Sequence, residues 1–163
     1  MATNEKIDVG TVFAGHDHNV CAETALKRAE KEVGERGLRL TPVRRRALEI
    51  LLEEHRALGA YEVLERLAAE GFGAQPPVAY RALDFLVEHG LAHRIQRLNA
   101  FAACMHAGLD HEPVFFICRD CKMVAETPAA PVRRAIQDAA DRIGFQPVHA
   151  HVEVLGVCPA CAV

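Results

Sequence analysis

The chain has 163 residues with a formal net charge of -3, and half of its residues are apolar. This length fits one domain or two small ones, and the apolar fraction is enough to bury a core. The charge excludes indiscriminate binding to nucleic acid, and the lack of any apolar run near the ~20 residues of a membrane helix excludes a membrane-spanning protein.

The first residues, "MATNEKIDVG", lack the basic-then-apolar order of a signal peptide. We therefore expect a cytoplasmic protein, in which the six cysteines are metal ligands or reactive thiols rather than disulfides. Residues 1–19 show no periodicity and predict a flexible tail. His16, His18 and Cys21 form an H-x-H-x-x-C motif at its end. Short motifs are permissive, so we expect this one to be disordered.

Four helices are predicted between residues 20 and 90. Apolar residues recur at helical spacing in the segments 21–37, 41–54, 61–71 and 76–90. Thr41 and Pro42 suit the N-cap and first helical position of the second segment, and glycines end the other three. Two short strand-like segments, 91–98 and 100–104, then meet near Asn99. This order is typical of a winged helix-turn-helix domain, with the third and fourth helices as the helix-turn-helix pair.

Strand and helix alternate after residue 105. Segments 114–118 and 123–126 predict strands, and 148–156 alternates strictly as a strand. Segment 131–144 predicts a helix with an inward apolar face of Val132, Ala135, Ile136, Ala139 and Ile143. A unit of about 55 residues is short for independent stability without further support. The expected fold class is therefore α+β, with a small α/β unit after the winged helix.

Two C-x-x-C motifs flank this unit, at Cys118 and Cys121 and at Cys158 and Cys161. Each turns back on itself, so four thiolates can complete a tetrahedron around a structural zinc. The alternative is four reduced cysteines without a ligand. A thioredoxin-type redox site is less consistent, because neither motif opens a helix after a strand. A zinc deaminase is excluded, because its histidine and cysteines lie on two well-separated helix starts.

A second set of metal-ligand side chains lies around the hinge between the two predicted parts: His93, Cys104, His111 and Glu126. Histidine and cysteine suit zinc, and a carboxylate can complete the tetrahedron. Each residue also has an ordinary structural interpretation, and the residue types alone leave the choice open. An additional site is a further hypothesis, because His149 and His151 share a strand face, with His106 as a partner across the unit.

The segments "RLTPVRRRALEIL", "AYEVLERL", "PPVAYRALDFLVEHGLAHRI", "HEPVFFICRDC" and "GVCPAC" occur in an order that resembles the ferric uptake regulator (Fur) family, on the zinc uptake regulator side. The resemblance implies a homodimeric repressor, not an enzyme, that binds double-stranded operator DNA. It implies a DNA-binding domain at 20–104 and a dimerisation and metal-binding domain at 105–163. It also implies at least two zinc ions per chain, a structural one on the four C-x-x-C cysteines and a regulatory one on His93, Cys104, His111 and Glu126.

The sequence departs from the family pattern at two places. The family usually has Thr or Ser before V-Y-R, whereas the run here is Val78-Ala79-Tyr80-Arg81, so one hydroxyl near the helix start is missing. The histidine-rich run before the first C-x-x-C is reduced to "HAGLDHEP". The reduced run weakens an iron-type site, and a cysteine in the wing favours zinc over iron or manganese because thiolate is a soft ligand.

Tyr61, Tyr80 and Arg81 are the DNA-reading residues that the resemblance implies. Arg81 suits a guanine, although it can instead pair with an acid on its own helix. Arg44 and Arg45 lie in the first turn of their helix, where cations oppose the helix dipole. A phosphate partner explains this local cost, and so does tolerated surface charge. We expect a zinc-responsive repressor of zinc uptake genes. The alternatives are a Fur-type sensor of iron, manganese, nickel or peroxide, and a redox-switched zinc protein.

Overall fold

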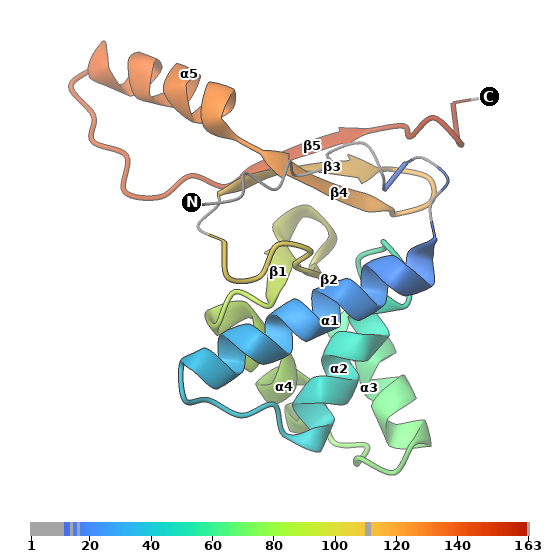
Figure 1. The fold of residues 1–163 in the computed structure, drawn as a ribbon. Helices are drawn as coiled ribbons and strands as arrows, with labels where there is room; N and C mark the ends of the chain where they lie inside the picture. The colour runs from blue at the N-terminus through green and yellow to red at the C-terminus, as the bar shows by residue number, and fades with distance from the viewer. Residues whose placement is uncertain (1–11, 14, 16, 110–111, 163) are drawn as a thin grey trace.

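The protein, in a computed structural model that describes residues 12–13, 15, 17–109 and 112–162, has a helical part and a sheet part that lie one above the other (Figure 1). The helical part contains α1 (His18–Glu35), α2 (Pro42–Leu52), α3 (Ala60–Ala69) and α4 (Pro76–Glu88). It also contains the hairpin β1 (Ala92–Ile95), η1 (Gln96–Leu98) and β2 (Ala100–Ala103). The sheet part contains β3 (Pro113–Cys118), β4 (Val124–Pro128), α5 (Ala130–Asp141) and β5 (Val152–Gly156). The predicted order of a winged helix followed by a small α/β unit is confirmed.

Helix α1 begins inside the segment that was predicted to be a flexible tail. Asp17 is its N-cap, and the Asp17 carboxylate accepts hydrogen bonds from the backbone N–H groups of Asn19, at 3.0 Å, and Val20, at 3.4 Å. An aspartate at this position satisfies N–H groups that have no partner within the helix. The prediction that His18 and Cys21 are disordered was therefore wrong, because a local cap extends the helix to residue 18.

The helical part is held by an apolar core between its helices. Fully or nearly fully buried leucine, isoleucine and valine side chains come from α2, α3 and α4, among them Leu48, Ile50, Leu51, Val63, Leu67, Leu83 and Leu86. Helix α4 is followed by Gly90, whose φ of 71° is a left-handed conformation that a residue with a β-carbon adopts only with strain. The chain then enters β1 at once, so the hairpin is fixed against the end of α4.

The hairpin is the wing of the helical part, and its register positions His93. Strands β1 and β2 are antiparallel, with His93 opposite Ala102, and the turn closes at Asn99, whose φ is 46°. Asparagine tolerates this left-handed conformation better than most residues. Beyond the last paired residues, the backbone N–H of Cys104 donates to the Leu91 carbonyl oxygen at 2.9 Å. Cys104 is thus held beside the start of β1.

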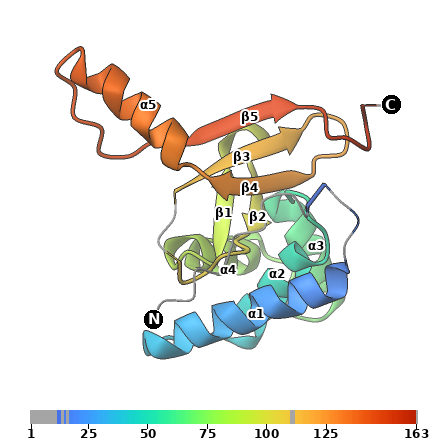
Figure 2. The same cartoon turned by 45° about the horizontal axis from the view of Figure 1, so that its top comes forward.

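The sheet has the order β4-β3-β5, in which β3 pairs antiparallel with β4 and parallel with β5 (Figure 2). Helix α5 lies in the crossover between β4 and β5. The parallel register places Cys118 opposite Gly156, which is two residues before Cys158 of the second C-x-x-C motif. Strand β5 begins at Val152, so the predicted strand at 148–156 is four residues too long.

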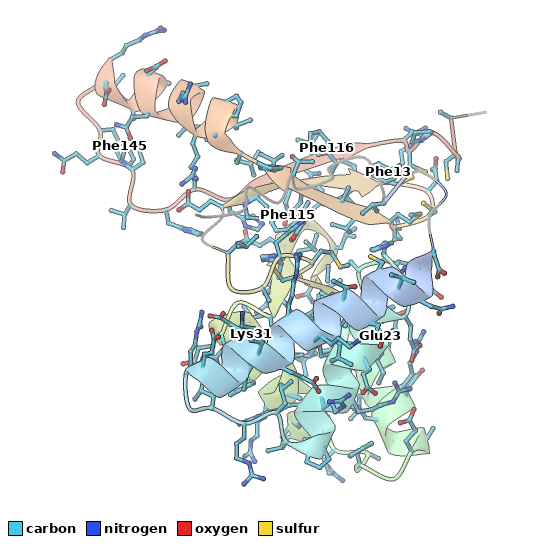
Figure 3. The ribbon with its side chains drawn as sticks, viewed as in Figure 1. Phe13, Glu23, Lys31, Phe115, Phe116 and Phe145 are labelled. Carbon is cyan, nitrogen blue, oxygen red and sulfur yellow. The ribbon has the colours of Figure 1, made fainter. Side chains whose placement is uncertain are left out.

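Helix α5 does not bury the face that its sequence pattern predicts. Among its residues only Ala140 is buried, and beyond its end Ile143 is 79% exposed and Phe145 is 60% exposed. Figures 1 and 3 show the helix leading away from the sheet, with Phe145 at the far end. Phe115 and Phe116 lie on opposite faces of the sheet, Phe115 buried and Phe116 41% exposed. The inward face predicted for α5 was therefore wrong, because no layer formed by the described residues of this chain covers it.

The helical part and the sheet part meet at an interface, called the seam below, which has its own apolar core and hydrogen bonds. This second core joins hairpin residues to the inner face of the sheet and consists of Ala57, Ile95, Ala100, Ala102, Phe115, Ile117 and Val124. The Glu153 carboxylate accepts the backbone N–H groups of Gln96, at 2.6 Å, and Arg97, at 2.9 Å. The Val124 N–H donates to the His55 carbonyl oxygen at 2.8 Å. No helix in the described ranges is long and apolar enough to cross a membrane.

Candidate metal centres and nucleic-acid interface

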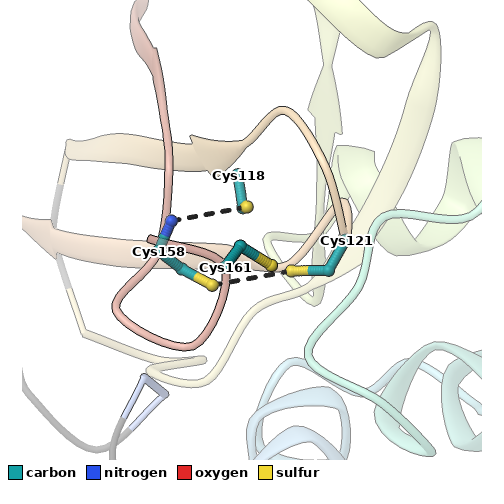
Figure 4. Close-up of side chains that lie close together, drawn as sticks. All are labelled: Cys118, Cys121, Cys158 and Cys161. Carbon is teal, nitrogen blue, oxygen red and sulfur yellow. Dashed lines mark hydrogen bonds between the residues drawn. The ribbon is translucent and has the colours of Figure 1, made fainter. Parts of the chain in front are cut away.

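The four C-x-x-C cysteines converge on one point at the end of the sheet (Figure 4). Cys118 is the last residue of β3 and Cys121 lies in the turn after it, whereas Cys158 and Cys161 come from the segment after β5. Cys121 Sγ and Cys158 Sγ are 3.7 Å apart. Zinc bonded tetrahedrally to sulfur at its usual length gives sulfur–sulfur separations of about 3.8 Å. The set has the geometry of a four-coordinate zinc site without an open position.

The electrostatics of this cluster also favour a cation. Backbone N–H groups of Cys121 and Cys158 lower the pKa of Cys118 to about 6, and the Cys158 N–H donates to Cys118 Sγ at 3.4 Å. Hydrogen bonds with Cys158 and Cys121 raise the pKa of Cys161 to about 12. The four sulfurs are too crowded to ionise together unless a positive ion neutralises them. Lys122, which follows the first motif, is held with a φ of 63°, and its N–H donates to the Cys118 carbonyl oxygen at 3.1 Å.

A second cluster lies at the seam between the two parts. His93 from β1, Cys104 after β2 and Glu126 from β4 place ligand atoms within 4.8 Å of one another. His93 Nε2 is 2.7 Å from Glu126 Oε2, and Cys104 Sγ is 3.9 Å from Glu126 Oε1. Cys104 is 2% exposed and Glu126 is 9% exposed. The structure therefore brings together three of the four side chains for which a regulatory metal was predicted, and the fourth, His111, lies outside the described residues.

His106 is a contact that the sequence did not predict at this place. Its Nδ1 is 2.5 Å from Glu126 Oε1, the oxygen that also accepts the Met105 N–H at 3.2 Å. The sequence grouped His106 with His149 and His151. A C-x-H spacing from Cys104 to His106 is the local signal that could have indicated its place. Glu126 is therefore the central residue of the cluster. Its hydrogen-bonding partners come from the wing and from the loop that follows the wing.

The charge state of His93 depends on the residues that surround its ring. Burial disfavours the protonated ring, but hydrogen bonds and charges from Cys104 and Glu126 outweigh burial and raise the pKa of His93 to about 9. The cluster therefore attracts positive charge, as a metal site with anionic ligands does. Its mixture of nitrogen, sulfur and oxygen ligands suits zinc.

The hypothetical additional site at His106, His149 and His151 is not assembled in the structure. His151 Nε2 lies 2.6 Å from Glu153 Oε1, which is the oxygen that caps η1, and His106 contacts Glu126 instead. His149 lies with α5 residues at the edge of a separate pocket. Within the described part of the chain, the groups that can hold a metal are the two above and a third one, composed of His18, Cys21 and His55.

Helix α4 presents the side chains that were predicted to read DNA. Tyr80 and Arg81 are exposed in its first half, and Tyr61 at the start of α3 is 62% exposed. The rings of Tyr61 and Tyr80 are 6.5 Å apart and nearly perpendicular. Arg81 makes no ion pair with an acid of its own helix among the interactions of the described residues, so the alternative of local pairing is not supported. The two tyrosine rings lie side by side at the helix-turn-helix, and the exposed Arg81 follows Tyr80 on α4.

Arg44 and Arg45 both have partners inside the protein. The Arg44 guanidinium lies 3.7 Å from the centre of the Phe85 ring, and Arg45 pairs with Glu30 and with Glu49, the latter at 2.9 Å. These contacts give the two arginines a structural role in joining α1, α2 and α4. The two acids beside Arg45 reduce the positive charge that it offers to a phosphate, which the sequence alone did not indicate.

Comparisons with known proteins identify relatives over most of the chain. The model of the ferric uptake regulator family matches residues 35–155. The zinc uptake regulation protein of Escherichia coli (strain K12) is 36% identical over 137 residues, which covers 83% of this chain and 80% of that protein. A zinc uptake regulator solved in complex with zinc and DNA has a TM-score of 0.79 at 35% identity, covering 86% of this chain and 94% of that one.

A third relative, XcZur, has been solved in two forms. Its holo form has a TM-score of 0.74, covering 84% of this chain and 96% of that chain, and its apo form has a TM-score of 0.52, covering 88% and 99%. Both forms are 36% identical to this chain, so the difference lies in how the elements are arranged and not in the sequence. The arrangement described above is similar to that of the holo form. The chain belongs to the ferric uptake regulator family.

Proposed function

We propose that this protein is a zinc-responsive transcriptional repressor that binds operator DNA as a homodimer and represses zinc uptake genes. The observation that carries the proposal is the buried His93–Cys104–Glu126 cluster at the seam between the DNA-facing part and the sheet. The zinc uptake regulation protein of E. coli and the regulator solved with zinc and DNA support it.

The regulatory ligands act by fixing one part of the molecule on the other. His93 and Cys104 belong to the wing, whereas Glu126 belongs to the sheet. A bound zinc supplies the positive charge that draws these ligands together, and a histidine of the loop after Cys104 completes the set. We assign that position to His111, with His106 holding the Glu126 carboxylate in place by its hydrogen bond. The thiolate favours zinc over iron or manganese, because it is a soft ligand.

The fixed arrangement matters because a dimer has two recognition helices. Two half-sites on DNA lie about one turn, ~34 Å, apart, so both α4 helices must be held at a matching separation and angle. When the seam is loose, the competent arrangement is a minor population and the apparent affinity falls by that fraction. Zinc and operator must then favour each other reciprocally. Arg81 reads a base edge, and Tyr61 and Tyr80 contact the DNA beside it.

The dimer contact is assigned to the sheet part. Its outer face carries Phe116 and, in the register of β3 and β5, Val154 directly opposite, and both side chains are exposed. Together with the exposed apolar residues of α5 and its following loop, they form an apolar surface of the kind that marks an interaction site. A second copy is the partner that the family membership supports.

The test is operator binding at fixed salt across buffered free zinc, with the metal counted per chain. Wild-type protein should bind as a dimer with two or more zincs per chain and release DNA when the free zinc falls. Cys104→Ser keeps the side-chain size but loses the thiolate, so this variant should remain folded with its four-cysteine zinc and need a much higher free zinc to bind. An unshifted zinc response of Cys104→Ser would contradict the seam as the sensor.

The same titration separates the alternatives. A Fur-type sensor of iron, manganese or nickel would respond to that ion at lower free concentration than to zinc. A redox-switched zinc protein would release zinc and DNA after mild oxidation at constant free zinc. Neither response is expected of the repressor proposed here.

A further inference from the structure

A third group of metal-ligand side chains lies where α1 approaches the seam. His18 and Cys21 come from the first turn of α1, and His55 comes from the segment after α2, more than thirty residues later. Their ligand atoms lie within 4.8 Å of one another. All three side chains are partly buried, so the group is neither a solvated surface patch nor a part of the apolar core. The cluster shares no side chain with the four-cysteine group or with the Glu126 group.

The distances within this cluster match those between ligands of one tetrahedral zinc. His18 Nδ1 is 3.1 Å from His55 Nε2, and Cys21 Sγ is 3.7 Å from the same His55 Nε2. Standard zinc–nitrogen and zinc–sulfur lengths at tetrahedral angles give separations of about 3.3 Å between two nitrogens and about 3.6 Å between nitrogen and sulfur. A hydrogen bond between the two imidazoles explains the first distance equally well, but it does not explain why a thiol lies against the same nitrogen.

The other nitrogen of His18 is oriented as metal-binding histidines require. His18 Nε2 lies 2.7 Å from the Glu53 carbonyl oxygen. A carbonyl only accepts, so Nε2 carries the proton and Nδ1 presents its lone pair to Cys21 and His55. Ligating histidines usually donate their second N–H to a carbonyl or carboxylate in this way, which fixes the tautomer and the ring orientation. The backbone therefore prepares His18 as a ligand.

The cluster also contacts the seam through the backbone of His55. The His55 carbonyl oxygen accepts the Val124 N–H of β4 at 2.8 Å. A water-sized cavity of about 20 Å³ is lined by His55 on one side and by His93 and Glu126 on another. An ion that fixes His55 to α1 therefore also supports the contact between α2 and the sheet.

We propose that His18, Cys21 and His55 bind a further zinc ion that ties the start of α1 to the seam. Two neutral imidazoles and one thiolate are ligands that zinc prefers, and a tetrahedral ion keeps a fourth position beyond these three. With fewer protein ligands than the four-cysteine site, this site releases its ion first on chelation. Any effect on DNA rests on the function proposed above, whereas binding of the metal does not.

The site can be tested with Co²⁺ as the probe, because a cobalt–thiolate bond gives a charge-transfer absorption band. The starting protein is the full-length dimer with His93→Ala and Cys104→Ser, which keeps zinc in its four-cysteine site but lacks the regulatory ligands. It should bind one Co²⁺ per chain with the band of a single thiolate. Adding Cys21→Ser should abolish the band, and adding His55→Ala should weaken Co²⁺ binding at least tenfold. No DNA is present, so failure here is separate from failure of the repressor function.

Controls keep the outcome interpretable. His89→Ala, at the end of α4, removes a histidine outside the cluster and should change neither the band nor the affinity. In the unmutated protein, zinc should protect Cys21 from alkylation, which tests the site without any substitution. The proposal is overturned if no Co²⁺ binds in the starting protein, if the band persists in the Cys21→Ser variant, or if zinc leaves Cys21 fully reactive.

Discussion

His106 Nδ1 lies 2.5 Å from Glu126 Oε1, on the carboxylate that also faces His93 and Cys104. A buried carboxylate held by a short hydrogen bond cannot rotate away from the ligands beside it. Its orientation is therefore fixed in the absence of a metal, and we propose that His106 contributes to zinc affinity without binding the ion.

We expect His106→Ala to weaken regulatory zinc binding by about 10–100-fold, which is the usual cost of losing a hydrogen bond that orients a metal ligand. His111→Ala should cost more, because it removes a ligand. The measurement is zinc competition with a chelator of known affinity, after the four-cysteine site has been filled. A larger loss for His106→Ala than for His111→Ala would mean that His106 is the ligand and that His111 is not.

The pH should change regulatory zinc binding in a defined direction. Because the pKa of His93 is raised to about 9, this ring is protonated at neutral pH in the metal-free protein and must lose its proton to bind zinc. Zinc affinity should therefore rise as the pH increases from 6 toward 9 and flatten above 9. Competition titrations across this range check it, with the four-cysteine site already filled. A flat response between pH 7 and 9 would contradict a protonated His93.

The exposed Arg81 and the ion-paired Arg45 should behave differently on DNA. Arg81→Ala should lose about 1–3 kcal/mol of discrimination between operator and random DNA, because it removes a base contact. Arg45→Ala should weaken both DNAs about equally and reduce the salt dependence, and its contacts with Glu30 and Glu49 limit the size of this effect. Binding to both DNAs at several salt concentrations separates the two cases. Equal losses on both DNAs for Arg81→Ala would remove it from base reading.

The four-cysteine site should support the dimer and not the zinc response. Cys158→Ser should cost dimerisation or solubility, because it breaks the link between the ends of β3 and β5. In the wild-type protein, a chelator should empty the regulatory site while the four-cysteine zinc remains. Sedimentation measures whether the protein is a dimer, and metal analysis counts the zinc ions that remain per chain. A Cys158→Ser variant that stays a stable dimer with full zinc-dependent repression would refute the structural assignment.

The exposed apolar face beside α5 predicts a dimer interface that one charge can disrupt. Ile143 is 79% exposed, so Ile143→Asp should leave the single chain folded but shift it from dimer to monomer. Val20→Asp is the matched control, because Val20 is an exposed apolar residue on α1, in the other part of the molecule. Molar mass by light scattering distinguishes the outcomes. An Ile143→Asp variant that remains dimeric would place the interface elsewhere.

The elements with strong local signals were the ones that the sequence could predict. Proline begins α2 and α4, glycine follows α4, and Asn99 closes the hairpin, all near the predicted places. The start of β5 depended on pairing instead. Val152 is opposite Val114 near the beginning of β3, so residues 148–151 extend past the sheet and have no strand beside them. An alternating pattern cannot show where the partner strand ends.

The candidate sites also differ in whether a signal in the sequence could predict them. Cysteine spacing predicted the four-cysteine group, and the family resemblance predicted the group at Glu126. His55 was missed, because it meets His18 and Cys21 only through the packing of α1 on the end of α2. Likewise, the pattern of α5 correctly shows an apolar face, but it cannot show whether the same chain or another molecule covers that face.

Lys122 keeps the turn of the first C-x-x-C motif in place without an ion. A residue with a β-carbon in the left-handed conformation is strained by roughly 1–2 kcal/mol, and Lys122 is held there beside this turn. Its N–H donates to the Cys118 carbonyl oxygen, and its own carbonyl oxygen accepts the Ala57 N–H, so backbone hydrogen bonds offset the strain. A zinc ion in a closed tetrahedron would give an incoming ligand no place to attack. We therefore expect zinc in this site to exchange slowly and to stay with the protein through a zinc shortage.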